Sequence, residues 1–363
     1  MTDPAAFRAQ FPVFERLIYL NAGTEGPVPR QAANAVRERI ELEVSQGRCG
    51  RPYFDGLMGL ATQMREAYAG VLGCDSSEVA LTGSTTDGVN TVIAGLRLGE
   101  GDEVLTSEEE HPGLLAPLGR ARVRFGISVR TVPFAELPGE VGPATKLVAC
   151  SHVSWVSGRV MDTDALADTG VPFLLDAAQA IGAVPVDVKA LGCDYYAASG
   201  QKWLCGPEGS GCLYVRPERL DELVVPWPGY GSLADPHEPL GFEPAEGVRR
   251  LDHGFPSGLR SAYALASLGV FAEAGWDWVH ERAASLAASL AERLAEHGLE
   301  VGPRGRSTLV SWKTDNADDE VARLAAAGIV VRSIPAFDLV RASVGAWSSE
   351  EDLERLVALV SGS

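Results

Sequence analysis

An aspartate and a lysine each stand in or just after a short apolar run that has the composition of a buried strand. Asp176 ends the run Val171 to Leu175, and Lys202 stands 26 residues later in Ser199-Gly200-Gln201-Lys202-Trp203. A lysine amine can condense with the aldehyde of pyridoxal phosphate, and a nearby carboxylate keeps the pyridine nitrogen of that cofactor protonated. The pair therefore predicts an enzyme that uses pyridoxal 5'-phosphate.

A hydroxyl-rich run stands where a phosphate group could bind. Thr85 and Thr86 belong to Thr82-Gly83-Ser84-Thr85-Thr86-Asp87, which follows an apolar run and opens a helix-like one. We expect these two threonines to bind the cofactor phosphate at the positive end of that helix. Taken alone, such a run is more often a helix cap, and only its combination with Asp176 and Lys202 favours a phosphate.

Three more polar residues lie beside the predicted pair. Gln179 is three residues after Asp176, one turn further on if a helix starts there, and it could hydrogen-bond the phenolic oxygen of the ring. Ser199 and Gln201 flank Lys202 on a glycine-containing turn and are expected to add donors to the same phosphate, although a polar turn before a helix would explain them equally well.

His111 follows another strand-like run, in Glu108-Glu109-Glu110-His111-Pro112. Its imidazole could stack on the cofactor ring and shuttle protons, whereas a loop histidine is otherwise simply solvated.

Arg332 and Arg341 could each bind a substrate carboxylate through two parallel hydrogen bonds, the alternative being a surface salt bridge. Arg341 is the stronger candidate, because a charge among apolar neighbours needs a partner. We also expect Ala22, in a glycine-bearing loop, to contact the substrate.

Composition limits the class of partner. The chain has 363 residues, 46% of them hydrophobic and 22% charged, with a formal net charge of -18. It has no basic stripe for nucleic acid and no apolar run of membrane-spanning length, and its first residues lack the order of a signal peptide. We therefore expect a cytoplasmic enzyme acting on a small molecule. Six cysteines and six histidines are scattered without metal-ligand spacing, so we expect reduced thiols, four of them in apolar surroundings, and no metal site.

Short apolar runs alternate with helix-like segments between residues 79 and 215, which is typical of a mainly parallel sheet covered by helices. In such sheets ligands bind at the carboxyl ends of the strands. We expect an α/β fold with a large domain over residues 15–272 and a small α/β domain formed by residues 1–14 and 273–363. The tail is predicted to contain one long helical region from Ser261 to His297, strands near residues 308–312, 330–332 and 339–344, and a last helix from Ser349. Residues 226–256 are predicted to form a long ordered loop.

These motifs together resemble a known family. The runs Ser-Thr-Thr-Asp-Gly-Val-Asn, Glu-Glu-His-Pro-Gly, Ser-His-Val-Ser-Trp, Asp-Ala-Ala-Gln and Ser-Gly-Gln-Lys-Trp are similar to those of the class V aminotransferase and cysteine desulfurase family, pyridoxal phosphate enzymes of fold type I with a seven-stranded sheet. The resemblance implies that Lys202 binds the cofactor, Asp176 pairs with the ring nitrogen, His111 stacks on the ring and Arg341 clamps the substrate carboxylate. It further implies that Gln179 contacts the ring oxygen and that Thr86 and Ser199 bind the phosphate.

The resemblance also implies a homodimer with active sites at the interface. In many relatives, a hydroxyl from the loop aligned with residues 253–257 reaches the phosphate of the partner subunit. Phe255 stands in the place of that hydroxyl here, which leaves Ser257 as its possible substitute.

Two departures bear on the reaction. Cysteine desulfurases carry a nucleophilic cysteine before the carboxylate-binding arginine, and the segment from Arg332 to Arg341 contains none. Trp155 stands where desulfurases have an asparagine, which resembles the carbon–sulfur lyases of the family. We therefore expect α,β-elimination from a cysteine- or cystine-like substrate. An aminotransferase, an epimerase, or a desulfurase that uses Cys205 or Cys49 remain alternatives, as does a catalytically silent relative that binds a partner.

Overall fold

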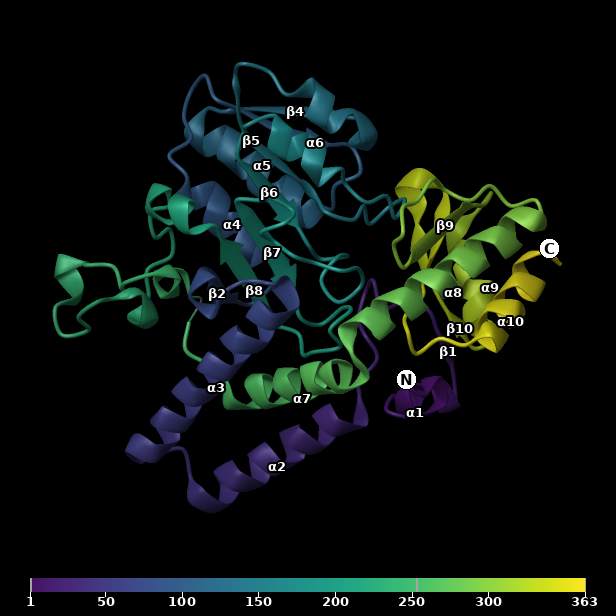
Figure 1. The fold of residues 1–363 in the computed structure, drawn as a ribbon, viewed down its shortest axis with the longest axis horizontal. Coiled ribbons are helices and arrows are strands. Elements are labelled where there is room, and N and C mark those ends of the chain that lie inside the picture. Colours follow the sequence, from purple (N-terminus) through teal and green to yellow (C-terminus); the bar gives the residue numbers. More distant parts are fainter. Residues whose placement is uncertain (1, 253, 363) are drawn as a thin grey trace.

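The computed structural model describes residues 2–252 and 254–362. A seven-stranded sheet forms the centre of the larger part of the molecule (Figure 1), in the order β2-β8-β7-β6-β5-β3-β4. Only β8 runs antiparallel to its neighbours, so the predicted mainly parallel sheet is confirmed. The strands are β2 (Val79–Thr82), β3 (Glu103–Ser107), β4 (Ser128–Val132), β5 (Thr145–Ser151), β6 (Phe173–Asp176), β7 (Tyr195–Ser199) and β8 (Gly211–Val215).

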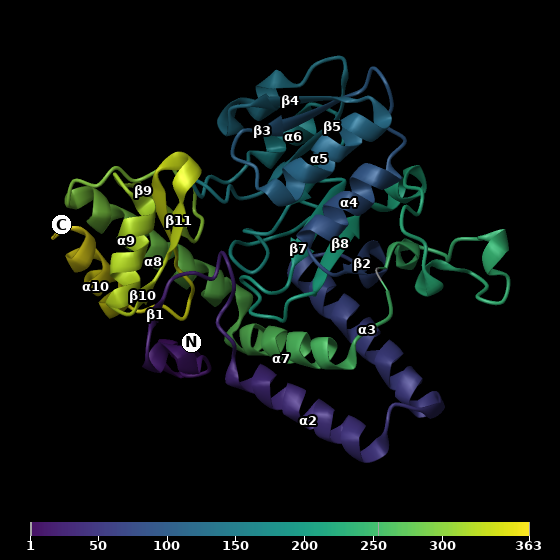
Figure 2. The same cartoon turned by 180° about the vertical axis from the view of Figure 1, so that it is seen from behind.

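Helices cover both faces of this sheet, as Figure 2 shows from behind. Successive strand residues point to opposite faces, so Phe173 and Leu175 belong to one apolar cluster, with residues of α3 and α7, while Leu174 belongs to another, with residues of α4 and α5. Burial on both faces is why the strands read as continuous apolar runs in the sequence. The helices of this part are α2 (Arg30–Gln46), α3 (Gly50–Leu72), α4 (Thr85–Gly95), α5 (Pro112–Phe125), α6 (Thr163–Asp168) and α7 (Gly258–Ala274).

The C-terminal elements form a second, smaller part around their own apolar cluster, which includes Leu290, Trp312 and Leu353. An antiparallel sheet of order β11-β12-β9 and a two-stranded sheet β1-β10 lie in it. Its elements are β1 (Ile18–Tyr19), α8 (Trp276–Glu296), β9 (Leu309–Lys313), α9 (Ala317–Ala326), β10 (Ile329–Val330), β11 (Arg332–Ile334), β12 (Leu339–Ser343) and α10 (Glu350–Val360).

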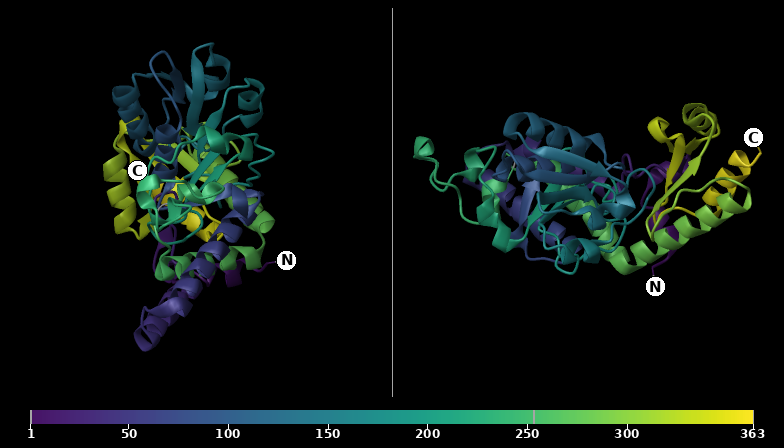
Figure 3. Two further views of the ribbon diagram at one scale, coloured as in Figure 1. Left: turned by 90° about the vertical axis from the view of Figure 1, so that its left-hand side faces the viewer. Right: turned by 90° about the horizontal axis from the view of Figure 1, so that it is seen from above.

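The N-terminal segment contacts both parts. Helix α1 (Pro4–Arg8) carries Arg8, whose guanidinium binds the carboxylate of Asp352 on α10 at 2.6 Å. Phe7 and Phe11 instead pack on Phe271 of α7, in the cluster of the larger part. Figure 3 shows the two parts side by side, with both termini on the side of the smaller one. The division at residues 14 and 272 stays a prediction.

Two local predictions were wrong. The single helical region from Ser261 to His297 is two helices, because Gly275 breaks it with φ 87°. The strand expected at 330–332 is divided between β10 and β11, which belong to different sheets. The helix on which the placement of Gln179 was conditional does not form, since residues 178–183 form turns. Residues 226–247 form the expected long loop, which projects away from the C-terminal elements (Figure 1).

None of the helices in the described part of the chain is both long and apolar enough to span a membrane.

Candidate active site

The carboxyl ends of the central strands open into a cavity of about 210 Å³. Asp176 ends β6 and Ser199 ends β7, while the residues after β2 and β3 bring Thr85 and His111 to the same edge. Ligands bind at this edge of parallel sheets. The cavity is lined by Gly23, Thr24, Glu25, Ser84, Thr85, Thr86, His111, Trp155, Asp176, Ala178, Gln179, Ser199, Gln201, Lys202, Arg332 and Arg341. Eleven of the thirteen residues singled out from the sequence are therefore brought together here.

Lys202 is surrounded by protein atoms but keeps access to the cavity. Burial lowers the pKa of its amine to about 8, with the carboxylate of Asp176 opposing this shift and the guanidinium of Arg341 adding to it. About a tenth of the amine is therefore neutral at pH 7, far more than for an ordinary lysine. Only a neutral amine can attack an aldehyde or accept a proton.

Asp176 is a buried carboxyl, 5% exposed, whose Oδ1 accepts a hydrogen bond from the backbone N–H of Ala178 at 2.9 Å. Burial raises the pKa of Asp176, whereas the Ala178 N–H and the charge on Lys202 oppose the rise. A buried carboxylate is stabilised by a cationic partner, and a protonated pyridine nitrogen is such a partner. Asp176 thus fits its predicted place beside the cofactor ring.

Gln179 lies on a turn, and two hydrogen bonds fix its side-chain amide. Its Nε2 donates to the carbonyl oxygen of Gly23 at 2.7 Å, and its Oε1 accepts from the indole Nε1 of Trp203 at 3.0 Å. An indole N–H only donates and a carbonyl only accepts. These partners therefore identify the amide oxygen of Gln179 as the atom facing Trp203 and the amide nitrogen as the atom facing Gly23. The second Nε2 hydrogen is left for the predicted hydrogen bond to the ring oxygen, which stays a prediction.

Two hydroxyl groups without partners line the cavity, one at the start of α4 and one at the end of β7. Ser84 caps this helix, and its Oγ accepts from the N–H of Asp87 at 3.1 Å. Thr85 Oγ1 and Ser199 Oγ are buried and have no hydrogen-bond partner among the described residues. Buried hydroxyls without partners are unfavourable, and a phosphate at a helix N-terminus would accept hydrogen bonds from both. The residues present therefore fit the phosphate end of pyridoxal phosphate.

His111 caps helix α5, with its Nδ1 accepting from the N–H of Gly113 at 3.0 Å. Its ring meets that of Trp155 edge to face, with centroids 5.0 Å apart. Burial lowers the pKa of His111 to about 4, and the nearby Lys202 and arginine charges lower it further. The ring is neutral at physiological pH, which suits stacking on an aromatic cofactor.

Two guanidinium groups face the cavity from the smaller part of the molecule. Arg341 and Arg332 are cross-strand neighbours on β12 and β11. Arg341 is 1% exposed, and its Nη1 donates to the carbonyl oxygen of Trp155 at 2.6 Å while its Nε has no partner among the described residues. Burial lowers the pKa of Arg341 to about 9, and the charge of Arg332 adds to this. Such a pair of cations requires an anion, and a carboxylate matches the guanidinium fork.

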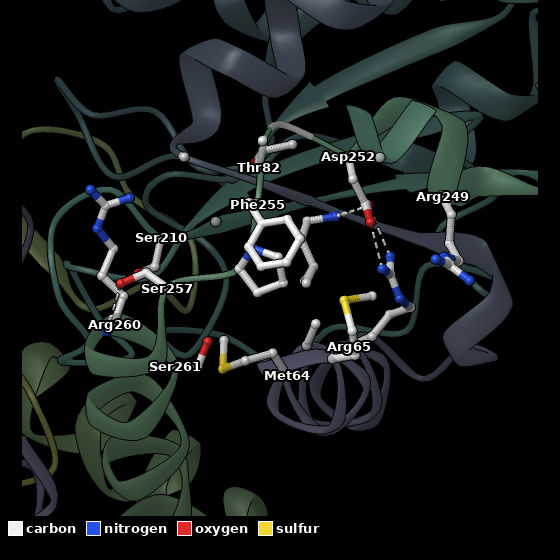
Figure 4. Close-up of a pocket in the computed structure, with 18 of the residues that line it drawn as sticks. Met64, Arg65, Thr82, Ser210, Arg249, Asp252, Phe255, Ser257, Arg260 and Ser261 are labelled. Carbon is white, nitrogen blue, oxygen red and sulfur yellow. Dashed lines mark hydrogen bonds and ion pairs between the residues drawn. The ribbon is translucent and has the colours of Figure 1, made fainter. Parts of the chain in front are cut away.

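The structure places two predicted residues elsewhere. Ala22 is fully buried and does not line the cavity, although the adjacent Gly23 does. Ser257 caps helix α7 and lines a second cavity of about 470 Å³, together with Phe255 and Arg260 (Figure 4). His253, in the same loop, lies outside the described residues. A contact of Ser257 with the phosphate of a partner subunit stays a prediction.

The sequence analysis did not single out Glu110, a buried carboxyl near the carboxyl ends of β3 and β5. Glu110 accepts hydrogen bonds from Ser107 Oγ at 2.6 Å and from the N–H and Oγ of Ser151 at 2.9 and 2.5 Å. Ser151 is the β5 neighbour of Asp176 on β6. Burial raises the pKa of Glu110 to about 7, despite those hydrogen bonds, and Asp176 adds to the rise. Glu110 thus joins the ends of β3 and β5 directly before His111.

Sequence comparison places the chain among known proteins. The profile of the class V aminotransferase family matches residues 19–356. A probable cysteine desulfurase of Methanothermobacter thermautotrophicus is 33% identical over 64% of this chain, and an isopenicillin N epimerase of Streptomyces clavuligerus is 32% identical over 65%. The matches span 61% and 64% of those two relatives. Cysteine desulfurase CsdA of Escherichia coli is 29% identical over 99% of this chain and 97% of its own length.

Solved structures of carbon–sulfur lyases are similar to this chain over nearly its whole length. The cystine C–S lyase C-DES, in complex with its reaction product cysteine persulfide, has a TM-score of 0.90 at 27% identity, over 97% of this chain and 99% of its own. A variant of C-DES with glycine covalently linked to the pyridoxal phosphate cofactor has a TM-score of 0.92, also at 27% identity, over 99% of each chain.

The protein belongs to the class V aminotransferase family. The predicted fold type and the predicted pyridoxal phosphate cofactor are confirmed by these relatives. The family includes both desulfurases and carbon–sulfur lyases, and epimerases are among the relatives, so the reaction must be argued from the residues of this site.

Proposed function

We propose that this protein is a lyase that cleaves the carbon–sulfur bond of a cysteine- or cystine-like amino acid by α,β-elimination. One observation carries the proposal: no cysteine is among the described residues that line the cavity around Lys202. Sulfur transfer requires a protein thiolate that attacks the bound substrate. Elimination requires only a base, an electron sink and a group that holds the substrate carboxylate.

The two cysteines considered as displaced nucleophiles are poorly suited to that role. Cys205 is fully buried, and burial raises the pKa of its thiol well above the usual value. Cys49 is exposed and stands directly before α3, outside the cavity lining. Neither supplies a thiolate beside Lys202, which supports elimination over desulfuration.

Each residue has a task in this reaction. When bound, pyridoxal phosphate supplies an electron-withdrawing ring conjugated to the substrate α-carbon. Asp176 keeps the ring nitrogen cationic, and Arg341 binds the α-carboxylate and orients the α-proton toward Lys202. The neutral amine of Lys202 removes that proton.

The atoms balance without an oxidant or a reductant. The α-proton is transferred to Lys202, and the electron pair of the Cα–H bond forms a double bond between Cα and Cβ. The electron pair of the Cβ–S bond leaves with the sulfur as a thiolate or persulfide. Addition of one water releases the remainder as pyruvate and ammonia. From cystine, the products are pyruvate, ammonia and cysteine persulfide.

Epimerisation is the second candidate reaction, and an epimerase is among the relatives. Proton removal by Lys202 is a step that epimerisation and elimination share. Product analysis separates the two. Holoenzyme incubated with cystine and with cysteine should release pyruvate, whereas alanine would indicate desulfuration and a racemised substrate would indicate epimerisation. Lys202→Ala should abolish product formation, while Glu292→Gln, an exposed residue of α8, should not affect it.

We further propose that the enzyme is a cytoplasmic homodimer. Several apolar or aromatic residues are exposed around the second cavity, and a partner subunit would cover them: Phe54, Met58, Tyr230 and Phe255. Sedimentation of the holoenzyme tests the subunit number.

A further inference from the structure

We propose that Glu25 determines substrate specificity by binding the distal ammonium group of a substrate with two α-amino acid heads, each head being one ammonium and one carboxylate group on the same carbon. The inference rests on the proposed lyase function, in which cystine is such a substrate. Glu25 had no signal in the sequence, and nothing in the proposed elimination uses it.

The backbone holds Glu25 beside the reactive lysine. The N–H of Glu25 donates to Asn21 O at 3.2 Å, and its carbonyl oxygen accepts from the hydroxyl of Tyr19 at 2.9 Å. The next residue, Gly26, donates to Gln201 O at 2.7 Å. A Cβ at position 26 would lie 2.0 Å from the carbonyl oxygen of Lys202, so only glycine allows the loop to approach this closely.

Glu25 lines the cavity, yet its carboxylate accepts no hydrogen bond and makes no ion pair with any described residue. Burial raises the pKa of Glu25, the nearby carboxylate of Glu208 raises it further, and the charge on Lys202 opposes the rise. A partly buried carboxylate next to a second one is stabilised by a cation. An ammonium group of the substrate would supply that cation.

Arg332 approaches the same loop from the smaller part. Its Nη1 lies 3.4 Å from the Oγ1 of Thr24, the residue before Glu25. Arg341, its cross-strand neighbour, donates to the carbonyl oxygen of Trp155 and binds the α-carboxylate in the proposed reaction. The cavity thus offers two guanidinium groups and one free carboxylate, in addition to Lys202 and Asp176.

This set of charges matches a substrate with two amino acid heads. One head uses Arg341 for its carboxylate and Lys202 for its α-proton. The other head brings a second carboxylate for Arg332 and a second ammonium for Glu25. A substrate with one head, such as cysteine, leaves Glu25 without a cation.

Binding of compounds that have no carbon–sulfur bond tests the subsite separately from the reaction. Diaminopimelate carries two heads, and 2-aminopimelate differs only in lacking the distal ammonium. The wild-type holoenzyme should bind diaminopimelate about tenfold more tightly, the effect of one charge-assisted contact. Glu25→Gln should remove this preference and Glu292→Gln should retain it. Arg332→Gln should weaken both ligands equally. An unchanged preference in Glu25→Gln would overturn the inference.

Kinetics provide the second test. Glu25→Gln should lower kcat/KM for cystine about tenfold and change that for S-ethylcysteine, which has no distal head, by less than about twofold. Equal losses on both substrates would contradict a subsite. If no sulfur amino acid yields pyruvate, the lyase proposal fails, and the diaminopimelate comparison still decides the role of Glu25.

Discussion

The indole Nε1 of Trp203 donates to the side-chain oxygen of Gln179 at 3.0 Å, and Trp203 directly follows Lys202, the lysine predicted to bind the cofactor. Both side chains are buried, and the other end of the amide is held by the carbonyl of Gly23. Trp203 therefore determines that Gln179 presents an N–H, rather than a carbonyl, to the cavity. This makes Trp203 a positioning residue that acts through Gln179.

Trp203→Phe should weaken pyridoxal phosphate binding about fivefold, because Gln179 loses the hydrogen bond that fixes its amide. The Phe ring keeps much of the packing, and a double-mutant cycle with Gln179→Ala removes the remaining packing effect. We expect a coupling of about 1 kcal/mol between the two positions, measured from cofactor dissociation constants. Fully additive effects would show that Trp203 acts only through packing.

The rate at which the apoenzyme captures pyridoxal phosphate should depend on pH in a specific way. Because the pKa of Lys202 is about 8, the rate should rise about tenfold per pH unit below that value and level off above it. Arg341→Met removes a cation that lowers this pKa, so the curve should move to higher pH. Stopped-flow absorbance measures the rate. The exposed Arg97, which does not line the cavity, gives a control variant, Arg97→Met, whose curve should coincide with the wild type.

Glu110 should make stability depend on pH. Its pKa in the folded protein is about 7, above the value of about 4.5 in an unfolded chain, so the folded state holds the extra proton between these values. Its contribution is fully present below pH 4.5 and is lost as pH rises through 7, with a maximum of about 3 kcal/mol. Glu110→Gln keeps the shape and cannot ionise.

Thermal unfolding of the two proteins from pH 5 to pH 8 checks this expectation. The variant should gain stability relative to the wild type as pH rises. A constant difference across that range would mean that Glu110 does not titrate there.

Residues whose environment is local could be predicted from the sequence. Asp176 follows an apolar run that the sheet buries on both faces, and Ser349 begins α10 because its Oγ accepts from the N–H of Asp352. In both cases, residues close in the sequence determine the local structure, namely a buried strand before Asp176 and a helix start at Ser349.

Contacts between distant residues could not be predicted. Glu110 and Ser151 are 41 residues apart, and Gln179 and Gly23 are 156 apart. Periodicity also failed at Gly275, because the residues on either side form helices and the break depends on one left-handed φ. Glu25 became a candidate only once folding had placed its loop against Lys202.

The products formed from cystine test the central claim most directly. Purified holoenzyme should release one pyruvate and one ammonia for each cystine consumed, with cysteine persulfide as the sulfur-containing product and no alanine. Alanine in place of pyruvate, or inverted cystine with neither product, would contradict elimination at Lys202.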